Sequence, residues 1–103
     1  MIRVSVFYPN AEGKRFDHEY YANKHITMIA DKLGAAMVRC EIDKGLAGMP
    51  PGQPAPFVAA VHMFFDSVDS FQGAFGAHTG AIMADIPNYT DIMPTIQISE
   101  VVS

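Results

Sequence analysis

The chain has 103 residues, of which half are hydrophobic and 17% are charged, and its formal net charge is −4. This length suits one domain. Because the chain is acidic and has no Lys/Arg cluster to neutralise phosphates, nucleic-acid binding is not expected. The longest apolar stretch, residues 57–65, is too short to cross a bilayer, and no leader precedes the first strand pattern, so no membrane association is expected. The single cysteine, Cys40, cannot form an internal disulfide and indicates a cytoplasmic protein.

The pattern along the chain predicts four strands and two helices. Strands show apolar and polar side chains in alternation, whereas helices show an apolar stripe with a period of 3.6 residues. The first helix should begin at Asp17, whose carboxylate can cap it, and stop at Gly34. The second should begin at Ser67 and end near Pro87. In chain order, we predict a strand at 2–8, a helix at 17–33, strands at 36–43 and 57–65, a helix at 67–86 and a strand at 93–102.

This order predicts a ferredoxin-like α+β fold, in which both helices cover one face of an antiparallel four-stranded sheet. In each strand, every second residue belongs to an apolar set that should face the helices. The alternate residues form the opposite sheet face, here called the mixed face because it carries both polar and apolar side chains. It includes Phe7, Ala60 and Phe64, which a face open to water would rarely display together. We therefore expect a homodimer joined through the mixed sheet faces. The side chains expected to face the helices are Val4, Val6, Val38, Cys40, Val61, Met63, Ile96 and Ile98.

One ionisable ring falls within the apolar stripe of the first helix. His25 projects there with Tyr21 and Met28 about one turn away on either side. Histidine is the side chain that exchanges protons near neutral pH. His25 is therefore either a structural residue bonded to a carbonyl or to Tyr21, or a general acid–base held in a pocket with Tyr21 as its hydrogen-bonding partner.

Other histidines admit two interpretations each. His62 projects from the mixed sheet face, opposite to His25, either as an interface residue satisfied by water or as a polar group inside a dimeric barrel. His78 lies at the edge of the second helix's apolar stripe, where it either packs or contacts substrate. His18 shares a helix face with His25 but lies about 10 Å away along the axis, too far to bind one metal ion with it. No metal site is expected, and without a Gly-x-Gly-x-x-Gly turn no nicotinamide or flavin cofactor is expected either.

Four stretches of the chain together carry a family resemblance. They are Phe16-Asp17-x-x-Tyr20-Tyr21-x-x-x-His25, Lys44-Gly45-Leu46-Ala47-Gly48, His62 before Phe64-Phe65-Asp66-Ser67, and Asp85-Ile86-Pro87-Asn88-Tyr89-Thr90. As a set they resemble the ethyl tert-butyl ether degradation (EthD) family. The resemblance implies a dimeric α+β barrel, and bacterial relatives that are filed as reductases and linked to oxidative breakdown of ethers or aromatic compounds. Thr27 stands where that family usually has proline, which predicts a straighter helix after His25.

Two hypotheses for the function follow. The first is a cofactor-independent oxidoreductase acting on a small, largely apolar metabolite in ether or aromatic compound degradation, with isomerisation or decarboxylation also compatible. The second is a non-catalytic binding or carrier protein for such molecules, accessory to an oxygenase system. Under the first hypothesis His25 is the general acid–base. The candidate site residues are His25 and Tyr21 as catalytic groups, and Tyr20, Met28, His62 and His78 as substrate contacts.

Overall fold

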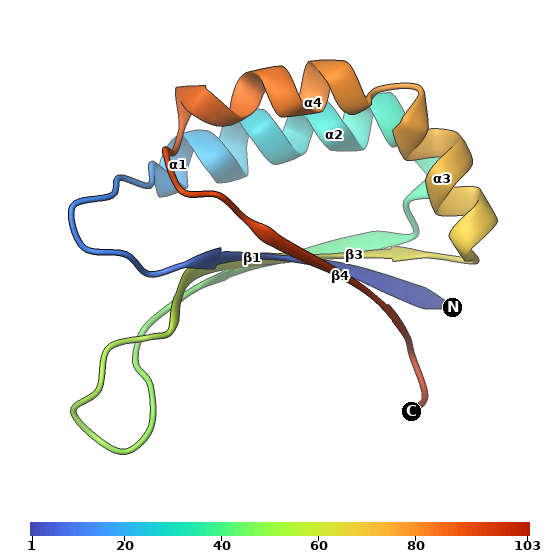
Figure 1. Ribbon diagram of the computed structural model, residues 1–103. Helices are drawn as coiled ribbons and strands as arrows, with labels where there is room; N and C mark the ends of the chain where they lie inside the picture. The colour runs from blue at the N-terminus through green and yellow to red at the C-terminus, as the bar shows by residue number, and fades with distance from the viewer.

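The computed structural model describes all 103 residues and has the expected ferredoxin-like architecture. Its four strands form one antiparallel sheet in the order β2-β3-β1-β4, and every helix lies on the same side of it (Figure 1). The turn η1 is one π-helical turn, whereas η2 and η3 are short 3₁₀ turns. The elements are β1 (Ile2–Pro9), α1 (His18–Tyr20), η1 (Tyr21–His25), α2 (Ile26–Leu33), η2 (Gly34–Ala36), β2 (Arg39–Lys44), β3 (Phe57–Phe65), α3 (Val68–Gly76), α4 (Thr79–Asp85), η3 (Ile86–Asn88) and β4 (Thr95–Glu100).

The first helix has the predicted ends and one unexpected turn. Asp17 caps its start, because Oδ1 accepts from the Tyr20 backbone N–H at 3.0 Å. It stops at Gly34, where φ is +57°, a backbone conformation that favours glycine. Between these ends, η1 inserts a π turn that carries both Tyr21 and His25. Such turns are often found at functional sites.

The second helix is broken, so the prediction of one helix over 67–86 is wrong. Ser67 caps its start as expected, accepting from the Ser70 backbone N–H at 3.1 Å. The helix ends at Gly76, His78 leaves the helical conformation (φ −123°, ψ 5°), and α4 begins at Thr79. Each glycine inside a helix costs about 1 kcal/mol relative to alanine, and Gly76 and Gly80 flank the break.

Two strands are shorter than predicted, and their ends are less buried. The chain makes the turn η2 before β2, so Val38 lies outside the sheet and is 47% exposed. Ile96 and Ile98 pair with Val6 and Val4 in register and so lie on the helix side. They remain 55% and 44% exposed, because β4 is the edge strand of the sheet.

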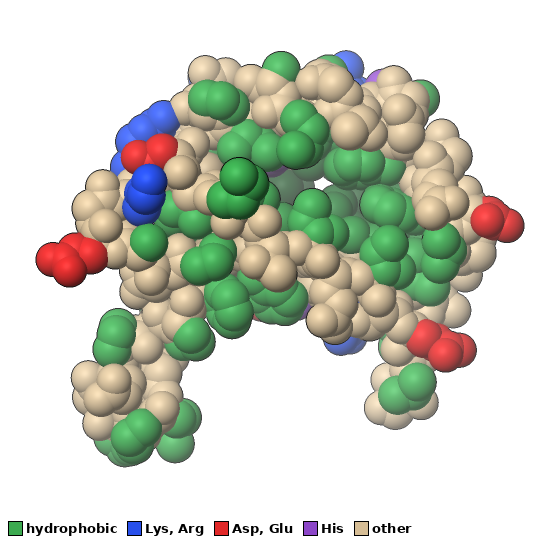
Figure 2. Space-filling view, viewed as in Figure 1, with side chains coloured by type: hydrophobic (Ala, Val, Ile, Leu, Met, Phe, Trp, Pro, Cys, Tyr) green, Lys and Arg blue, Asp and Glu red, His purple; other side chains and the backbone are tan.

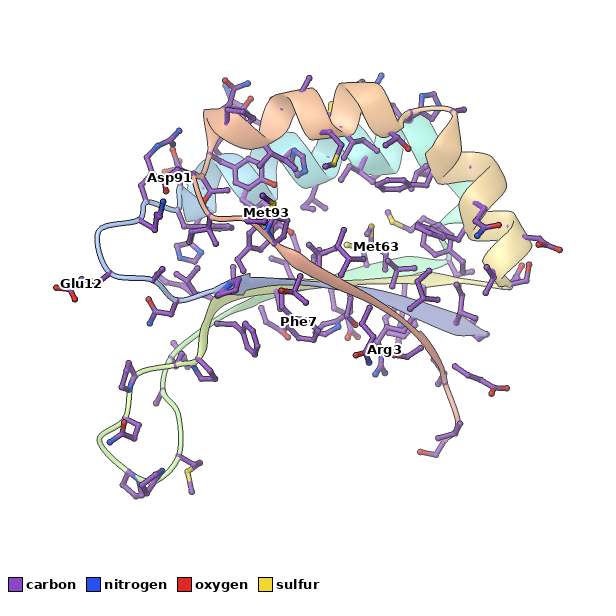
Figure 3. All side chains as sticks on the ribbon, in the orientation of Figure 1. Arg3, Phe7, Glu12, Met63, Asp91 and Met93 are labelled. Atoms are coloured by element: carbon purple, nitrogen blue, oxygen red, sulfur yellow. The ribbon has the colours of Figure 1, made fainter.

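The core lies between the sheet and the helices. Met63 of β3 projects into this layer, whereas Arg3 and Phe7 of β1 project from the opposite face (Figure 3). On that opposite face the Phe64 ring lies under two guanidinium groups, those of Arg39 at 4.2 Å and Arg3 at 5.1 Å from the ring centroid. No helix covers this mixed face, and the loop of residues 45–56 and the C-terminal end extend past it (Figure 1). None of the helices has the length and apolar composition needed to traverse a lipid bilayer.

Candidate functional site

A small apolar cleft with a cavity volume of about 40 Å³ lies between the sheet and the helix layer. Twelve of its 14 lining residues are hydrophobic, among them Ile26 and Ile29 of α2, Ile82 of α4, and Ile96 of β4. Figure 2 shows the hollow between the helices and the strands, surrounded by hydrophobic side chains.

His25 brings a polar ring into this cleft. The side chain belongs to the last residue of the π turn, is 3% exposed and lines the cleft. Its Nδ1 lies 2.9 Å from Oδ2 of Asp85, the last residue of α4. An ionised carboxylate can only accept hydrogen bonds, so Nδ1 carries the proton and donates a hydrogen bond to Asp85. The other ring nitrogen, Nε2, makes no hydrogen bond within the chain and keeps its lone pair free.

Asp85 is itself held by neighbouring donors. Its Oδ1 accepts from the Tyr20 hydroxyl at 2.7 Å and from Nδ2 of Asn88 at 2.9 Å. Burial raises the pKa of Asp85, but the hydrogen bonds from Asn88, Tyr20 and His25 outweigh burial and hold the pKa below its usual value. The carboxylate therefore stays ionised and fixes the orientation of the imidazole.

The protonation state of His25 follows from its burial. Desolvation lowers the pKa of the ring, and the attraction of Asp85 reverses only part of that effect, so the pKa lies below its ordinary value. The ring is therefore neutral at neutral pH. With Nδ1 donating to Asp85, Nε2 is available as a base.

Tyr21 lies against His25 but does not bond to it. The two rings stack at 18°, with centroids 5.6 Å apart. The expectation that Tyr21 is the hydrogen-bonding partner of His25 is therefore wrong, because Asp85 takes that position. The Tyr21 side chain is 1% exposed, and its hydroxyl is buried without any hydrogen-bond partner. Nearby, the hydroxyls of Tyr8 and Tyr89 bond to each other at 2.7 Å.

The remaining candidate residues lie apart from the cleft. Tyr20 does not line it and acts instead on Asp85. Met28 packs against the core, and His78 lies at the break between α3 and α4. His62 projects from the mixed face, as predicted, where Nδ1 lies 2.8 Å from Ser5 Oγ and Nε2 lies 3.2 Å from Asp43 Oδ2. No three His, Cys, Asp or Glu side chains come close enough together to hold a metal ion.

Sequence reasoning missed Asp85, although it lies in one of the four stretches that carry the family resemblance. One signal was present. A carboxylate at the C-terminal end of a helix is opposed by the helix dipole, so its presence there favours a specific role. Asn88 and Tyr89, which follow Asp85, were missed as well, because no local sequence pattern pairs them with residues of the first helix.

Fold and cleft together define a ferredoxin-like α+β protein with a buried histidine in an apolar cleft and a partly exposed carboxylate bonded to it. The EthD domain model matches residues 12–92, so the chain belongs to the EthD family. An EthD-like protein from Ralstonia eutropha JMP134 is 47% identical, with a TM-score of 0.95 over 99% of this chain and 92% of that one.

Two more distant structures share the fold. An EthD family protein from Bacillus halodurans C-125 is 21% identical, with a TM-score of 0.68 and 99% coverage of both chains. HapK from Hahella chejuensis is 13% identical, with a TM-score of 0.56 over 97% of this chain and 92% of that one. A search of curated protein sequences gives no significant match.

Proposed function

We propose that the cleft is the active site of an enzyme that transfers a proton on a small, largely apolar molecule, with His25 as general acid–base. The observation that carries this proposal is the 2.9 Å contact between His25 Nδ1 and Asp85, which leaves Nε2 unpaired in an apolar cleft. Asp85 is a positioning residue, since it acts through His25.

The surroundings of His25 suit proton transfer. Burial lowers the pKa of His25 and so keeps the ring neutral at neutral pH, where Nε2 can take up a proton. Once Nε2 has taken up a proton, the imidazolium is stabilised by the ionised Asp85 on the other side of the ring.

The finer assignment, an oxidoreductase of ether or aromatic compound degradation that uses no cofactor, is part of the same proposal. Removing a proton from an apolar molecule gives an anion that is more easily oxidised than its neutral parent, and molecular oxygen or a partner protein would have to accept the electrons. The first step is therefore shared by an oxidoreductase, an isomerase and a decarboxylase acting in this cleft. A cytoplasmic location and an oxygenase system as partner belong to the proposal too.

A comparison of binding with turnover tests this proposal. Small apolar molecules with acidic protons are screened for binding and for exchange of those protons in heavy water. We expect His25→Asn to abolish the catalysed exchange while binding persists. His18→Asn is the matched control, because His18 lies on the same helix outside the cleft, and it should retain exchange. Binding without exchange in the unmodified protein would instead identify a carrier.

A second copy of this chain is the proposed partner of the mixed sheet face. Two features of the face support burial against another chain. Its central histidine already has partners, since His62 bonds to Ser5 and Asp43, so covering that ring would strand neither nitrogen. Phe7 remains only partly covered, and its ring contacts Phe57 at a centroid distance of 5.0 Å.

A further inference from the structure

Resting on the proposed function, we infer that the substrate is an uncharged carbonyl compound with an acidic C–H beside the carbonyl. In this arrangement the Tyr21 hydroxyl donates a hydrogen bond to the carbonyl oxygen, and His25 Nε2 receives the carbon-bound proton. Tyr21 is then a catalytic residue in its own right. Its role is distinct from the hydrogen-bonding partner of His25 that the sequence suggested.

The Tyr21 hydroxyl is the observation on which this inference depends. It is buried and has no partner in the chain, although leaving such a group unpaired is costly in free energy. Its ring lines the cleft, so a ligand that displaces the side chains packed around the hydroxyl can supply the missing acceptor. The hydroxyls of Tyr8 and Tyr89 already bond to each other and are not free in the same way.

The charge of the cleft restricts the ligand. No Lys, Arg, Asp or Glu side chain is among its 14 lining residues. A carboxylate or phosphate entering this space would lose its hydration without gaining an opposite charge, which is strongly unfavourable. The ligand is therefore uncharged before the reaction begins, and its body contacts side chains such as Ile29 and Ile82.

The two polar groups complement one functional group. Tyr21 offers a donor, and His25 Nε2 offers an acceptor, on rings that stack 5.6 Å apart. A carbonyl with an acidic neighbouring C–H presents an acceptor and a transferable proton on adjacent atoms. Amides and ethers without such a proton can accept a hydrogen bond from Tyr21 but offer no proton to His25 Nε2.

The proton transfer balances without an oxidant. The C–H bond breaks and its proton goes to His25 Nε2, while its electron pair forms a carbon–carbon double bond and the carbonyl oxygen becomes an enolate oxygen. That oxygen is stabilised by the Tyr21 O–H. Return of the proton from His25 to the same or another carbon completes an exchange or an isomerisation. Burial raises the pKa of Tyr21 strongly, so it donates a hydrogen bond and keeps its proton.

Three probes with one ring skeleton test the inference. They are 2-indanone, which has a carbonyl and acidic neighbouring protons, indane, which has neither, and indane-2-carboxylate, which is charged. Binding of each is measured by competition, and exchange of the 2-indanone protons in heavy water is followed by NMR. The proteins are the unmodified chain, Tyr21→Phe and His25→Asn, with Met28→Leu as a control outside the cleft.

We expect 2-indanone to bind most tightly, and Tyr21→Phe to weaken its binding about tenfold while leaving indane binding unchanged. Equal binding of 2-indanone to Tyr21→Phe, tighter binding of the carboxylate, or no binding of 2-indanone would overturn the inference. Failure of the proposed function looks different. Exchange would then be absent or survive in His25→Asn, while the Tyr21-dependent preference for the ketone over indane remained.

Discussion

His25 and Asp85 are 60 residues apart in the chain, yet Nδ1 of one lies 2.9 Å from Oδ2 of the other. The contact joins the π turn of the first helix to the end of α4. It fixes which imidazole nitrogen carries the proton, and thereby which one keeps its lone pair. The proposed proton transfer depends on both residues of this pair.

Replacing Asp85 should therefore damage catalysis more than binding. In Asp85→Asn the amide no longer fixes the imidazole tautomer and no longer stabilises the imidazolium, so we expect proton exchange to fall roughly 10²-fold or more. The measurement is the exchange rate of 2-indanone protons beside its dissociation constant. Asp31→Asn, an exposed carboxylate on α2, is the control and should change neither. An Asp85→Asn rate within twofold of the unmodified rate would contradict the proposed role.

The pH dependence of stability should report the burial of His25. Its pKa is lower in the folded chain than its ordinary value of about 6.5, so below that pH the unfolded chain binds the proton more readily. The contribution of His25 to stability is thus fully present above about pH 6.5 and is lost as the pH falls below it. Urea unfolding at a series of pH values should show a shallower acid dependence in His25→Asn. An unchanged slope would show that the ring titrates as it does in water.

The buried pair of hydroxyls at Tyr8 and Tyr89 should show strong non-additivity. Changing either tyrosine to phenylalanine leaves the other hydroxyl buried without its partner, at a cost of about 1–3 kcal/mol in the free energy of unfolding. The double variant leaves neither hydroxyl, so it should cost less than the sum of the two. A double-mutant cycle by urea unfolding measures the difference. Purely additive effects would mean that the two groups do not interact.

Two glycines should respond to alanine in opposite directions, although an added Cβ meets no atom within 4 Å at either. At Gly34 φ is +57°, so alanine should lower the free energy of unfolding by about 1 kcal/mol or more. At Gly73, inside α3, alanine should raise it by about 0.4–1 kcal/mol, because the unfolded chain loses freedom. Thermal unfolding of the two single variants tests this, and changes of the same sign would contradict it.

The proposed homodimer can be tested on the mixed sheet face. Phe7→Asp places a charge in the middle of that face and should convert the dimer to a monomer, because a buried, unpaired charge is costly. Val68→Asp, at the start of α3, is the control and should leave the mass unchanged. Sedimentation equilibrium gives the masses, and circular dichroism confirms that each variant folds. A monomeric mass for the unmodified chain would contradict the proposed homodimer.

The placement of His25 and His62 on opposite sides of the sheet was predictable, because each position follows from a local periodicity in the sequence. Helical spacing places His25 on the apolar stripe, and strand alternation places His62 on the mixed face. The caps at Asp17 and Ser67 were equally local and are confirmed. The break before His78 was missed, because helical periodicity says little about how much helix stability glycines such as Gly76 remove.

The sequence by itself thus determined the fold class, the family and the position of His25 in the apolar layer, since these depend on residues close together in the chain. Only the tertiary structure decided that Asp85 is its partner and that the Tyr21 hydroxyl is left without one. Such pairings depend on how the two helices lie side by side on the sheet. A hydrogen bond tolerates only a few tenths of an ångström of error, and a periodic pattern does not fix distances between distant segments.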